Sequence, residues 1–375
     1  LTSVVAEIVA GLTGEANVAP HVPLMDIGMD SLSATHLASE LEQRVGIEVS
    51  PTLIFEYSTA GAIAAHLRSS LQRDAVPMAA IAEAPRTDLL SALVGLTGMS
   101  AMLPAGANTL LDARQVMSTG ADTITTVPAD RWQLPRPIQE ALESVGKAVH
   151  DRAKHGGFVE GAELFDGSFF GVSNAESAEM DPQQRLLLER GYEALHTGGL
   201  DSGAIASVNG LVGVFVGIEM QDFQEVLRTR AASVYLATGS SLSVAAGRLS
   251  FTMGLHGPCA AYLTACSASL TAYHVARRSV QLNECAGSVA AGVNMMLLPG
   301  TSIALGLAGM SSALGRCHTF DARADGYARG EAIVAATLRR GHSSPWSASG
   351  SAVRSDGRSA SLTAPNAQAQ IGLLV

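Results

Sequence analysis

The stretch HGPCAAYLTACSASLTAYHVARRSV (residues 256–280) decides the fold of most of this chain. A short apolar run precedes Cys266, and a segment with the spacing of a helix follows it. In that helix we expect Leu270, Tyr273 and Ala276 to share one face. The stretch therefore predicts a strand, a turn and a helix, with Cys266 at the helix N-terminus, where the thiolate is favoured. A cysteine in that position is a candidate nucleophile.

The segments around this unit repeat its pattern. Apolar, glycine-rich runs at residues 211–218 and 286–297 alternate with helical segments at residues 181–195 and 269–282. Such alternation is typical of an α/β domain, and we expect a largely parallel sheet.

The first 72 residues have a different pattern, which is that of a small helical bundle. Apolar residues recur at helical spacing within residues 1–12, 34–45 and 63–71. Residues that can end or begin helices lie between or within these segments: Gly11, Gly14, Gly46, Ser58 and Thr59. From residue 73 to 88 the chain has two prolines, many alanines and no period, and we interpret it as a linker.

The composition is that of an acidic folded protein. Hydrophobic residues make up 47% and charged residues 15% of the 375 residues, far from the composition of disordered chains. The net charge of -10 and the isoelectric point near 5.5 argue against nucleic acid as a ligand and favour basic protein partners.

A positive mean hydropathy of +0.24 raises the question of a membrane span. The best candidate, residues 89–103, is shorter than the roughly 20 apolar residues that a span needs. We predict no span and interpret this segment as a buried strand with its turn. The chain begins at Leu1 without an initiator methionine or a targeting signal, which suggests a piece of a longer polypeptide.

The four cysteines form no CxxC pair and resemble no disulfide framework. This usage favours a reducing compartment and predicts no metal site. A buried structural role is the common one for a lone intracellular cysteine, and we expect it for Cys259, Cys285 and Cys317.

Ser31, in the stretch MDIGMDSLSATHL (residues 25–37), stands where a periodic helix begins. Serine is a favoured N-cap, and capping alone explains the residue on local grounds. A phosphodiester on Ser31 would also be stabilised there by the positive end of the helix dipole. The stretch itself leaves both roles open.

The longer segment formed by residues 24–67 closely resembles an acyl carrier protein of the polyketide and fatty acid synthase type. The match includes the loop that ends in Asp-Ser-Leu and the third-helix region SPTLIFEYST (residues 50–59). The resemblance implies an all-α four-helix bundle in which Ser31 bears 4'-phosphopantetheine, taken from coenzyme A by a phosphopantetheinyl transferase. Asp30 and Leu32 are then positions for packing and partner recognition at the same site.

The heptapeptide TACSASL (residues 264–270) resembles the nucleophile motif of β-ketoacyl synthases of the thiolase superfamily. The resemblance extends from about residue 89 to 340 through a series of blocks in order: VPADRW (127–132), HGGFVEGAELFDGSFFGVS (155–173), EMDPQQRLLLERGYEAL (179–195), YLATGSSLSVAAGRLSF (235–251) and CHTFDARADGYARGEA (317–332). It implies a layered αβαβα fold, Cys266 as the nucleophile and a homodimer. Leu263 and Ala268 depart from the pattern, since an Asp and a Ser are usual at these two positions.

Six polar residues within the matching blocks are expected to anchor loops around the site. They are Arg248, Asp321, Asp325, Tyr327, Arg329 and Glu331.

Ketosynthases of this kind also use two histidines and a lysine, which belong to the second thiolase-like half. None of the ten histidines of this chain stands in either histidine motif. Residues 350–370 resemble the opening of that second half. We therefore expect the catalytic histidines to be absent from this chain, and the helix after Cys266 to keep apolar surface exposed.

The two resemblances imply a multidomain chain: an acyl carrier domain at 1–72, a linker at 73–88, the N-terminal half of a ketosynthase at 89–340 and the truncated start of its C-terminal half at 341–375.

The implied function is chain assembly by a type I polyketide synthase or a fatty acid synthase. An acyl chain carried on Ser31 would move to Cys266 for decarboxylative Claisen condensation with a malonyl-type extender. The alternative is a non-catalytic carrier protein with an inactive ketosynthase portion. The implied partners are the transferase, an acyltransferase with other synthase domains, acyl and malonyl thioesters and a second copy of the chain. The expected compartment is the cytoplasm, or a plastid if a larger chain is targeted there.

Overall fold

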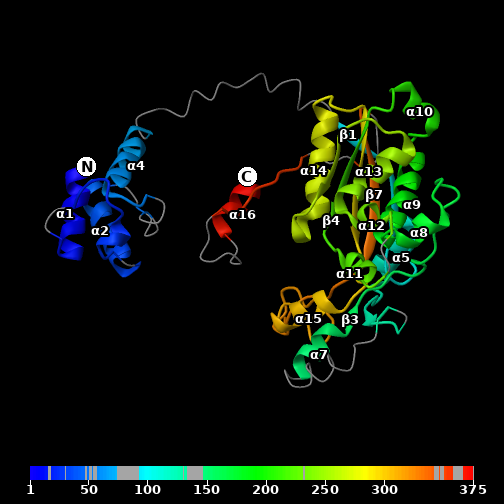
Figure 1. The fold of residues 1–375 in the computed structure, drawn as a ribbon, viewed down its shortest axis with the longest axis horizontal. Coiled ribbons are helices and arrows are strands. Elements are labelled where there is room, and N and C mark those ends of the chain that lie inside the picture. The colour runs from blue at the N-terminus through cyan, green and yellow to red at the C-terminus, as the bar shows by residue number, and fades with distance from the viewer. Residues whose placement is uncertain are drawn as a thin grey trace. The chain divides into compact units, whose positions relative to one another are not determined.

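The computed structural model divides the chain into two compact units, Leu1–Arg86 and Thr87–Val375 (Figure 1). Each unit is described by itself. The structure describes residues 1–15, 18–29, 31–46, 49, 53, 57–73, 93–129, 131–132, 147–230, 233–341, 346, 350–357 and 366–374. Apart from its first residue, Arg73, the predicted linker lies outside these residues, and so does most of the third-helix region.

The first unit is helical, as predicted. Its described elements are α1 (Thr2–Thr13), the 3-10 helix η1 (Leu24–Ile27), α2 (Ser31–Val45) and α4 (Ala60–Arg73). One apolar cluster joins the three α-helices; its fully buried members include Val5, Val9, Leu37, Leu41, Ile63 and Ala64. Burial of these stripes, more than helix propensity, holds the short helices in place.

The helix boundaries of this unit follow the expected signals with one exception. Gly14 ends α1 in the left-handed conformation (φ 76°), whereas Gly11 lies inside the helix. Thr59 caps α4, because its Oγ1 accepts a hydrogen bond from the N–H of Ala62 at 3.1 Å. Of the two candidate caps, Ser58 and Thr59, the threonine therefore caps the helix.

A five-stranded sheet forms the centre of the second unit, with strand order β1-β7-β6-β4-β5. Its strands are β1 (Val94–Met102), β4 (Val212–Ile218), β5 (Cys259–Tyr262), β6 (Gly287–Asn294) and β7 (Ala332–Arg340). A separate two-stranded sheet pairs β2 (Thr125–Thr126) with β3 (His155–Gly156).

The prediction of a largely parallel sheet is wrong for one half of this sheet. Strand β4 pairs in parallel with β5 and β6, but β7 is antiparallel to both β6 and β1. The reason lies in the connection: Ala332 pairs with Asn294, so β7 begins beside the end of β6 and has to run back. At the other end of β7, Arg340 lies opposite Val94 of β1.

Helices cover both faces of the sheet (Figure 1). Helices α9 (Pro182–Thr197) and α13 (Leu242–Met253) pack on one face, and α14 (Ala268–Gln281) packs on β4 and β6 from the other. The alternation along β4 shows the division, since Val214 and Val216 belong to the cluster of the first face and Phe215 to that of the second. The other described helices are shorter: α5 (Leu110–Thr119), α7 (Lys147–Ala153), α8 (Asn174–Glu179), α10 (Ser202–Ser207), α11 (Asp222–Arg228), α12 (Leu236–Ser240), α15 (Gly300–Leu307) and α16 (Ala367–Leu374).

The face that α14 presents to the sheet differs from the expected one. Its small residues Ala272 and Ala276 are fully buried against the sheet, whereas Leu270 is 72% exposed. Leu270 and Ala276 therefore do not share a face. The helix packs through its smallest side chains because it approaches the sheet closely.

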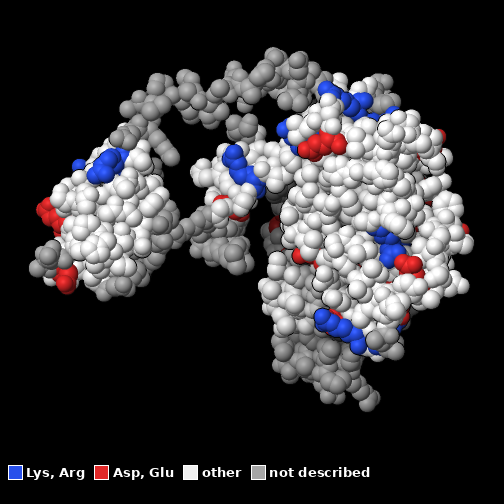
Figure 2. All heavy atoms as spheres, turned by 45° about the horizontal axis from the view of Figure 1, so that its top comes forward, with Lys and Arg blue, Asp and Glu red and all other residues white. Residues whose placement is uncertain are grey.

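The distribution of surface charge and the lengths of the helices bear on whether this chain binds nucleic acid or crosses a membrane. On the face that Figure 2 displays, the basic residues of the described chain lie apart from one another, with wide uncharged areas between them. Within the described ranges, every helix is too short or too polar to cross a membrane. The apolar segment at residues 89–103 contains strand β1, as expected.

Candidate active site

Cys266 lies in a tight turn between strand β5 and helix α14. The turn is the 3-10 helix η2 (Ala265–Ser267), and Cys266 is exposed in it. Ala265 takes the left-handed conformation (φ 50°), which is uncommon for a residue with a side chain. The Ser267 Oγ and N–H both donate to the Thr264 carbonyl, at 2.8 and 3.1 Å, and brace the turn.

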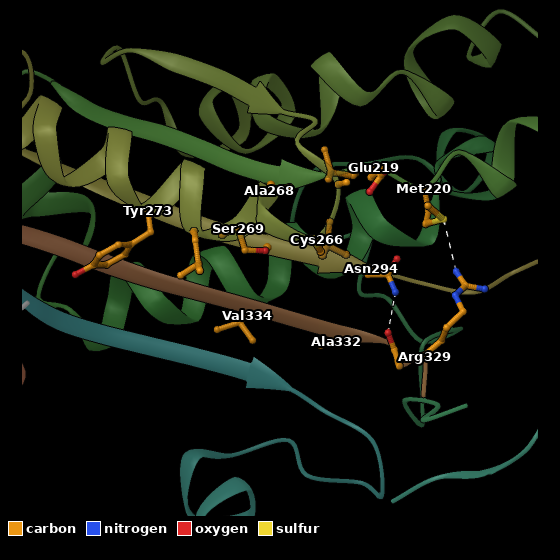
Figure 3. Close-up of a pocket in the computed structure, with 18 of the residues that line it drawn as sticks. Glu219, Met220, Cys266, Ala268, Ser269, Tyr273, Asn294, Arg329, Ala332 and Val334 are labelled. Atoms are coloured by element: carbon orange, nitrogen blue, oxygen red, sulfur yellow. Dashed lines mark hydrogen bonds between the residues drawn. The ribbon is translucent and has the colours of Figure 1, made fainter. Parts of the chain in front are cut away.

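The exposed side of Cys266 faces a cavity of about 940 Å³. Figure 3 shows Cys266 and Ser269 near the start of α14, with Asn294 and Arg329 beyond them and Tyr273 further along the helix. The lining comes from α14, from strands β4, β6 and β7, from α15 and from the loop before β7. Most of the lining side chains are small or apolar, which suits a ligand with an apolar portion.

The loop before β7 places two polar groups in the cavity: it carries Arg329, and it binds Asn294. Arg329 donates to the Ser302 Oγ at 2.6 Å and contacts the Met220 Sδ at 3.8 Å. Burial lowers the pKa of Arg329. Asn294, at the end of β6, donates to the Gly330 carbonyl at 2.7 Å. The loop and the strand end are thus joined at the edge of the cavity.

Glu331 anchors the same loop at its junction with β7. Its carboxylate is buried and accepts hydrogen bonds from the N–H groups of Val159 and Met296, both at 2.9 Å, and from Arg131 at 3.0 Å. Burial raises the pKa of Glu331 although Arg131 opposes that effect. This is the anchoring role expected from the sequence.

The other expected anchors are spread around the unit. Arg248 pairs with Glu176 at 2.5 Å and donates to Gln184 at 2.9 Å. Asp325 accepts a hydrogen bond from the N–H of Ala313 at 3.0 Å.

Asp321 and Tyr327 differ in their relation to the cavity. Hydrogen bonds from the Arg323 side chain and N–H lower the pKa of the half-buried Asp321 to about 2. Tyr327 lines the cavity itself. Of the six expected anchors, Tyr327 and Arg329 therefore reach the site directly.

The three remaining cysteines differ from one another. Cys285 is buried, and burial raises its pKa to about 11. The expectation of a buried role is wrong for Cys259 and Cys317, which are exposed. Cys259 begins the edge strand β5, and Cys317 lies in the loop before β7, where its Sγ accepts a hydrogen bond from the N–H of Ala328. An edge strand and a surface loop leave a side chain open to solvent.

The departures from the family pattern can also be placed. Leu263 follows β5 and is 55% exposed, and Ala268 is buried at the start of α14. Within the described part of the chain, the residues that line the cavity include no histidine. His274 on α14 instead contacts the Ser351 Oγ through its Nδ1 at 3.0 Å, as a helix residue in a packed position.

Ser31 is the first residue of helix α2 in the first unit. Leu32 follows it in the helix, and Asp30 lies outside the described residues. Two residues before the helix, Met29 is buried in the core of the unit, and Gly28 takes the left-handed conformation (φ 91°). The first turn of α2 holds no acidic residue. A helix start of this kind fits a phosphodiester on the serine hydroxyl.

Several cavity residues cannot be found from the motifs alone. Asn294 of β6 and Thr301 and Leu305 of α15 come from separate segments, and only the tertiary fold brings them to one cavity. The sequence block around Arg329 marks that residue but does not indicate its place in the cavity.

Two family models match the chain. The model of the β-ketoacyl synthase N-terminal domain matches residues 92–343, and the model of the phosphopantetheine attachment site matches residues 3–67. The second match identifies covalently attached 4'-phosphopantetheine as the prosthetic group of the first unit.

Curated relatives of the chain are polyketide synthases. The chain is 36% identical over 375 residues to polyketide synthase GfsB of Streptomyces halstedii, and the match covers 96% of the chain and 7% of that protein. It is 34% identical over 383 residues to erythronolide synthase EryA2 of Saccharopolyspora erythraea, with 99% and 10% covered. The chain thus spans a tenth or less of the length of these two relatives.

Solved ketosynthases have a similar fold. One is the oxazolomycin ketosynthase domain OzmH KS7 of Streptomyces albus, with a TM-score of 0.58 and 33% identity over 66% of this chain and 42% of that one. Another is the ketosynthase from module 6 of the bacillaene synthase of Bacillus subtilis, with a TM-score of 0.62 and 26% identity over 75% of this chain and 47% of that one. The thiolase-like fold predicted for the second unit is confirmed by these similarities. The chain belongs to the β-ketoacyl synthase family, with a phosphopantetheine attachment domain of the acyl carrier type ahead of its ketosynthase domain.

Proposed function

We propose that this chain takes part in chain assembly by a type I polyketide synthase, with Ser31 as the attachment point of the carrier and Cys266 as the acyl acceptor of the ketosynthase. The observation that carries the proposal is the position of Cys266, exposed at the start of α14 and facing a largely apolar cavity. A thiol held in that way can take an acyl group whose chain is accommodated beside it.

The acyl transfer follows from the chemistry of Cys266. Its sulfur, as thiolate, attacks the carbonyl carbon of an acyl thioester and forms a tetrahedral intermediate. The bond to the original sulfur then breaks, the leaving thiolate takes a proton, and the acyl group remains on Cys266. We propose that the backbone N–H of Cys266 supplies one donor to the oxyanion. The prosthetic group on Ser31 supplies a thiol on a flexible arm, which raises the local concentration of the thioester.

The condensation itself needs more than Cys266. Loss of CO2 from a malonyl-type extender leaves an enolate, and donors have to stabilise its oxygen before its carbon attacks the acyl group on Cys266. No histidine lines the cavity among the described residues. We therefore propose that this chain by itself accepts an acyl group but does not condense it with an extender.

The proposed partners follow from the same chemistry. A phosphopantetheinyl transferase loads Ser31, and an acyltransferase with other synthase domains supplies acyl and malonyl thioesters. A second copy of the chain is a further proposed partner, through the ketosynthase unit. Strand β5 supports it, because it lies at the edge of the sheet with Leu263 and, on the neighbouring α13, Phe251 exposed. The free cysteines agree with a reducing compartment such as the cytoplasm.

The proposed role of Cys266 is tested by incubating the chain with a short acyl thioester of N-acetylcysteamine and measuring the intact mass. We expect one acyl group on the wild type and none on Cys266→Ala. Cys317→Ala, which removes another exposed thiol, should be acylated like the wild type. Equal acylation of Cys266→Ala and the wild type would contradict the proposal, and an absence of acylation in all three would favour the non-catalytic carrier.

A further inference from the structure

Two glycines lie side by side beneath the first turn of α14. Gly217 of β4 and Gly292 of β6 are direct partners in the parallel ladder between these strands. Both line the cavity that contains Cys266. The next pair along the same ladder face, Phe215 and Ala290, carries side chains that pack against α14. The pair of glycines therefore leaves a gap in the side chains of the sheet where the helix begins.

The start of α14 fills this gap. A Cβ atom at Gly217 would lie 2.4 Å from the Ser269 N and 2.5 Å from the Ala268 C. A Cβ atom at Gly292 would lie 2.1 Å from the Ser269 Oγ and 2.8 Å from the Ser269 Cβ. Contacts under 3.0 Å are essentially absent for real Cβ atoms, so a side chain at either position has to displace the helix start or the Ser269 side chain.

Cys266 lies only three residues before Ser269, so a shift of the Ser269 backbone also moves the turn that holds Cys266. The Ala268 N–H donates to the Ala265 carbonyl, which closes a ring of backbone around Cys266. Ala265 already holds a left-handed conformation, so it has little freedom to absorb a shift. The position of the Cys266 thiol relative to the helix N-terminus therefore depends on where Ser269 lies against Gly217 and Gly292.

We propose that Gly217 and Gly292 are positioning residues for Cys266, because together they form a side-chain-free seat that fixes the start of α14 on the sheet. The inference rests on the proposed role of Cys266 as the nucleophile. It assigns the two strand glycines to the function of the site and not only to packing. A thiol that moves away from the helix N-terminus loses part of the stabilisation of its thiolate.

The test uses alkylation of the full chain by iodoacetamide, followed by mass spectrometry of the cysteine peptides. The measured quantity is the rate at Cys266 divided by the rate at the exposed Cys317, at one fixed pH near neutral. For Gly292→Ala we expect this ratio to fall several-fold, because the displaced thiol no longer keeps its place at the start of α14.

Gly98→Ala is the matched control. A Cβ atom at Gly98 of β1 would lie 2.3 Å from both the Ala194 O and the Gly198 N, so the clash is at least as severe but falls on the backbone at the end of α9, away from the cavity. Gly98→Ala should reduce the stability of the unit and leave the ratio of rates unchanged. A folded Gly292→Ala chain whose ratio matches that of Gly98→Ala, or exceeds that of the wild type, would overturn the proposal.

A second variant keeps the test decisive if Gly292→Ala fails to fold. The atoms that a Cβ at Gly292 would meet belong to the side chain of Ser269, and the Ser269 Cα would be 3.7 Å away. Ser269→Gly combined with Gly292→Ala should therefore restore folding and the ratio of rates. A folded double variant with a low ratio would also overturn the proposal. Because alkylation needs no thioester, a wild type that is alkylated selectively at Cys266 but never acylated would refute the proposed function alone.

Discussion

Single residues in this chain owe their chemistry to burial and to the ends of helices. Cys266 and Cys285 are both cysteines of the same unit, yet one lies exposed before α14 and the other is buried after it, with its pKa raised to about 11. The sequence indicates Cys266 and Ser31 because each belongs to a short contiguous motif. It does not indicate Asn294 or the cavity position of Arg329, because strand pairing and not the local sequence brings them to the site.

Ser31 allows a direct test at this scale. A phosphopantetheinyl transferase with coenzyme A should add the mass of one prosthetic group to the wild type and nothing to Ser31→Ala, because only a hydroxyl can form the phosphodiester. Ser39→Ala, at an exposed position of the same helix α2, should be modified like the wild type. The measurement is the intact mass of each chain. Modification of Ser31→Ala to the wild-type extent would disprove the assignment.

Asp181 makes the stability of the second unit depend on pH. It caps α9, is 2% exposed and accepts a hydrogen bond from the N–H of Gln183 at 2.8 Å. Burial raises its pKa from 3.8 to about 6, so its contribution to stability is fully present below about pH 4 and is lost as the pH rises through 6. That difference corresponds to about 3 kcal/mol.

Asp181→Asn should therefore flatten the pH dependence of the free energy of unfolding between pH 4 and 7, because an amide has no charge to bury. Urea titrations at several pH values measure this slope. Asp201→Asn, a change at the exposed cap of α10, serves as the control and should keep the wild-type slope. An unchanged slope in Asp181→Asn would show that another group dominates.

Helices and strands of this chain are more predictable in kind than in arrangement. The periodicity indicates α9, α14, β4 and β6 correctly, since each is a long stretch of one pattern. The direction of β7 is not predictable, because a buried strand is apolar in the same way whether its neighbours are parallel or antiparallel. The periodicity also fails to indicate the buried face of α14, since the seat on the two glycines favours small residues over Leu270.

The cap of α4 provides a test at the level of one helix. Thr59→Ala removes the acceptor for the N–H of Ala62 and should destabilise the first unit by about 1 kcal/mol. Ser58→Ala is the matched control, because the cap contact with α4 comes from the neighbouring threonine. Chemical unfolding followed by circular dichroism of the chain measures the difference. Equal stability of the two variants would argue against Thr59 as the cap.

The whole molecule consists of two units with separate cores. The carrier cluster and the two clusters around the sheet share no residue among those described. Cooperative unfolding depends on a shared core, so we expect the two units to unfold in separate transitions.

Glu331→Ala tests this separation. It removes a buried carboxylate that satisfies two N–H groups and Arg131, and should destabilise the second unit by about 3 to 5 kcal/mol. The transition of the first unit should not move. Differential scanning calorimetry of the whole chain measures both transitions. A shift of the carrier transition by the same change would show that the two units unfold together.

The pairing of β1 with β7, the first and last strands of the sheet in chain order, has a consequence for recombination between related proteins. Val94 lies opposite Arg340, and the N–H of Gly341 donates to the Leu93 carbonyl at 3.0 Å, so the polypeptide enters and leaves the sheet at one shared corner. If residues 94–340 were exchanged for the corresponding segment of a related protein, both junctions with the rest of the chain would lie at this corner of the sheet. Crossover points just outside β1 and β7 take both paired strands from the same parent protein. A crossover between the two strands would pair a β1 from one parent with a β7 from the other.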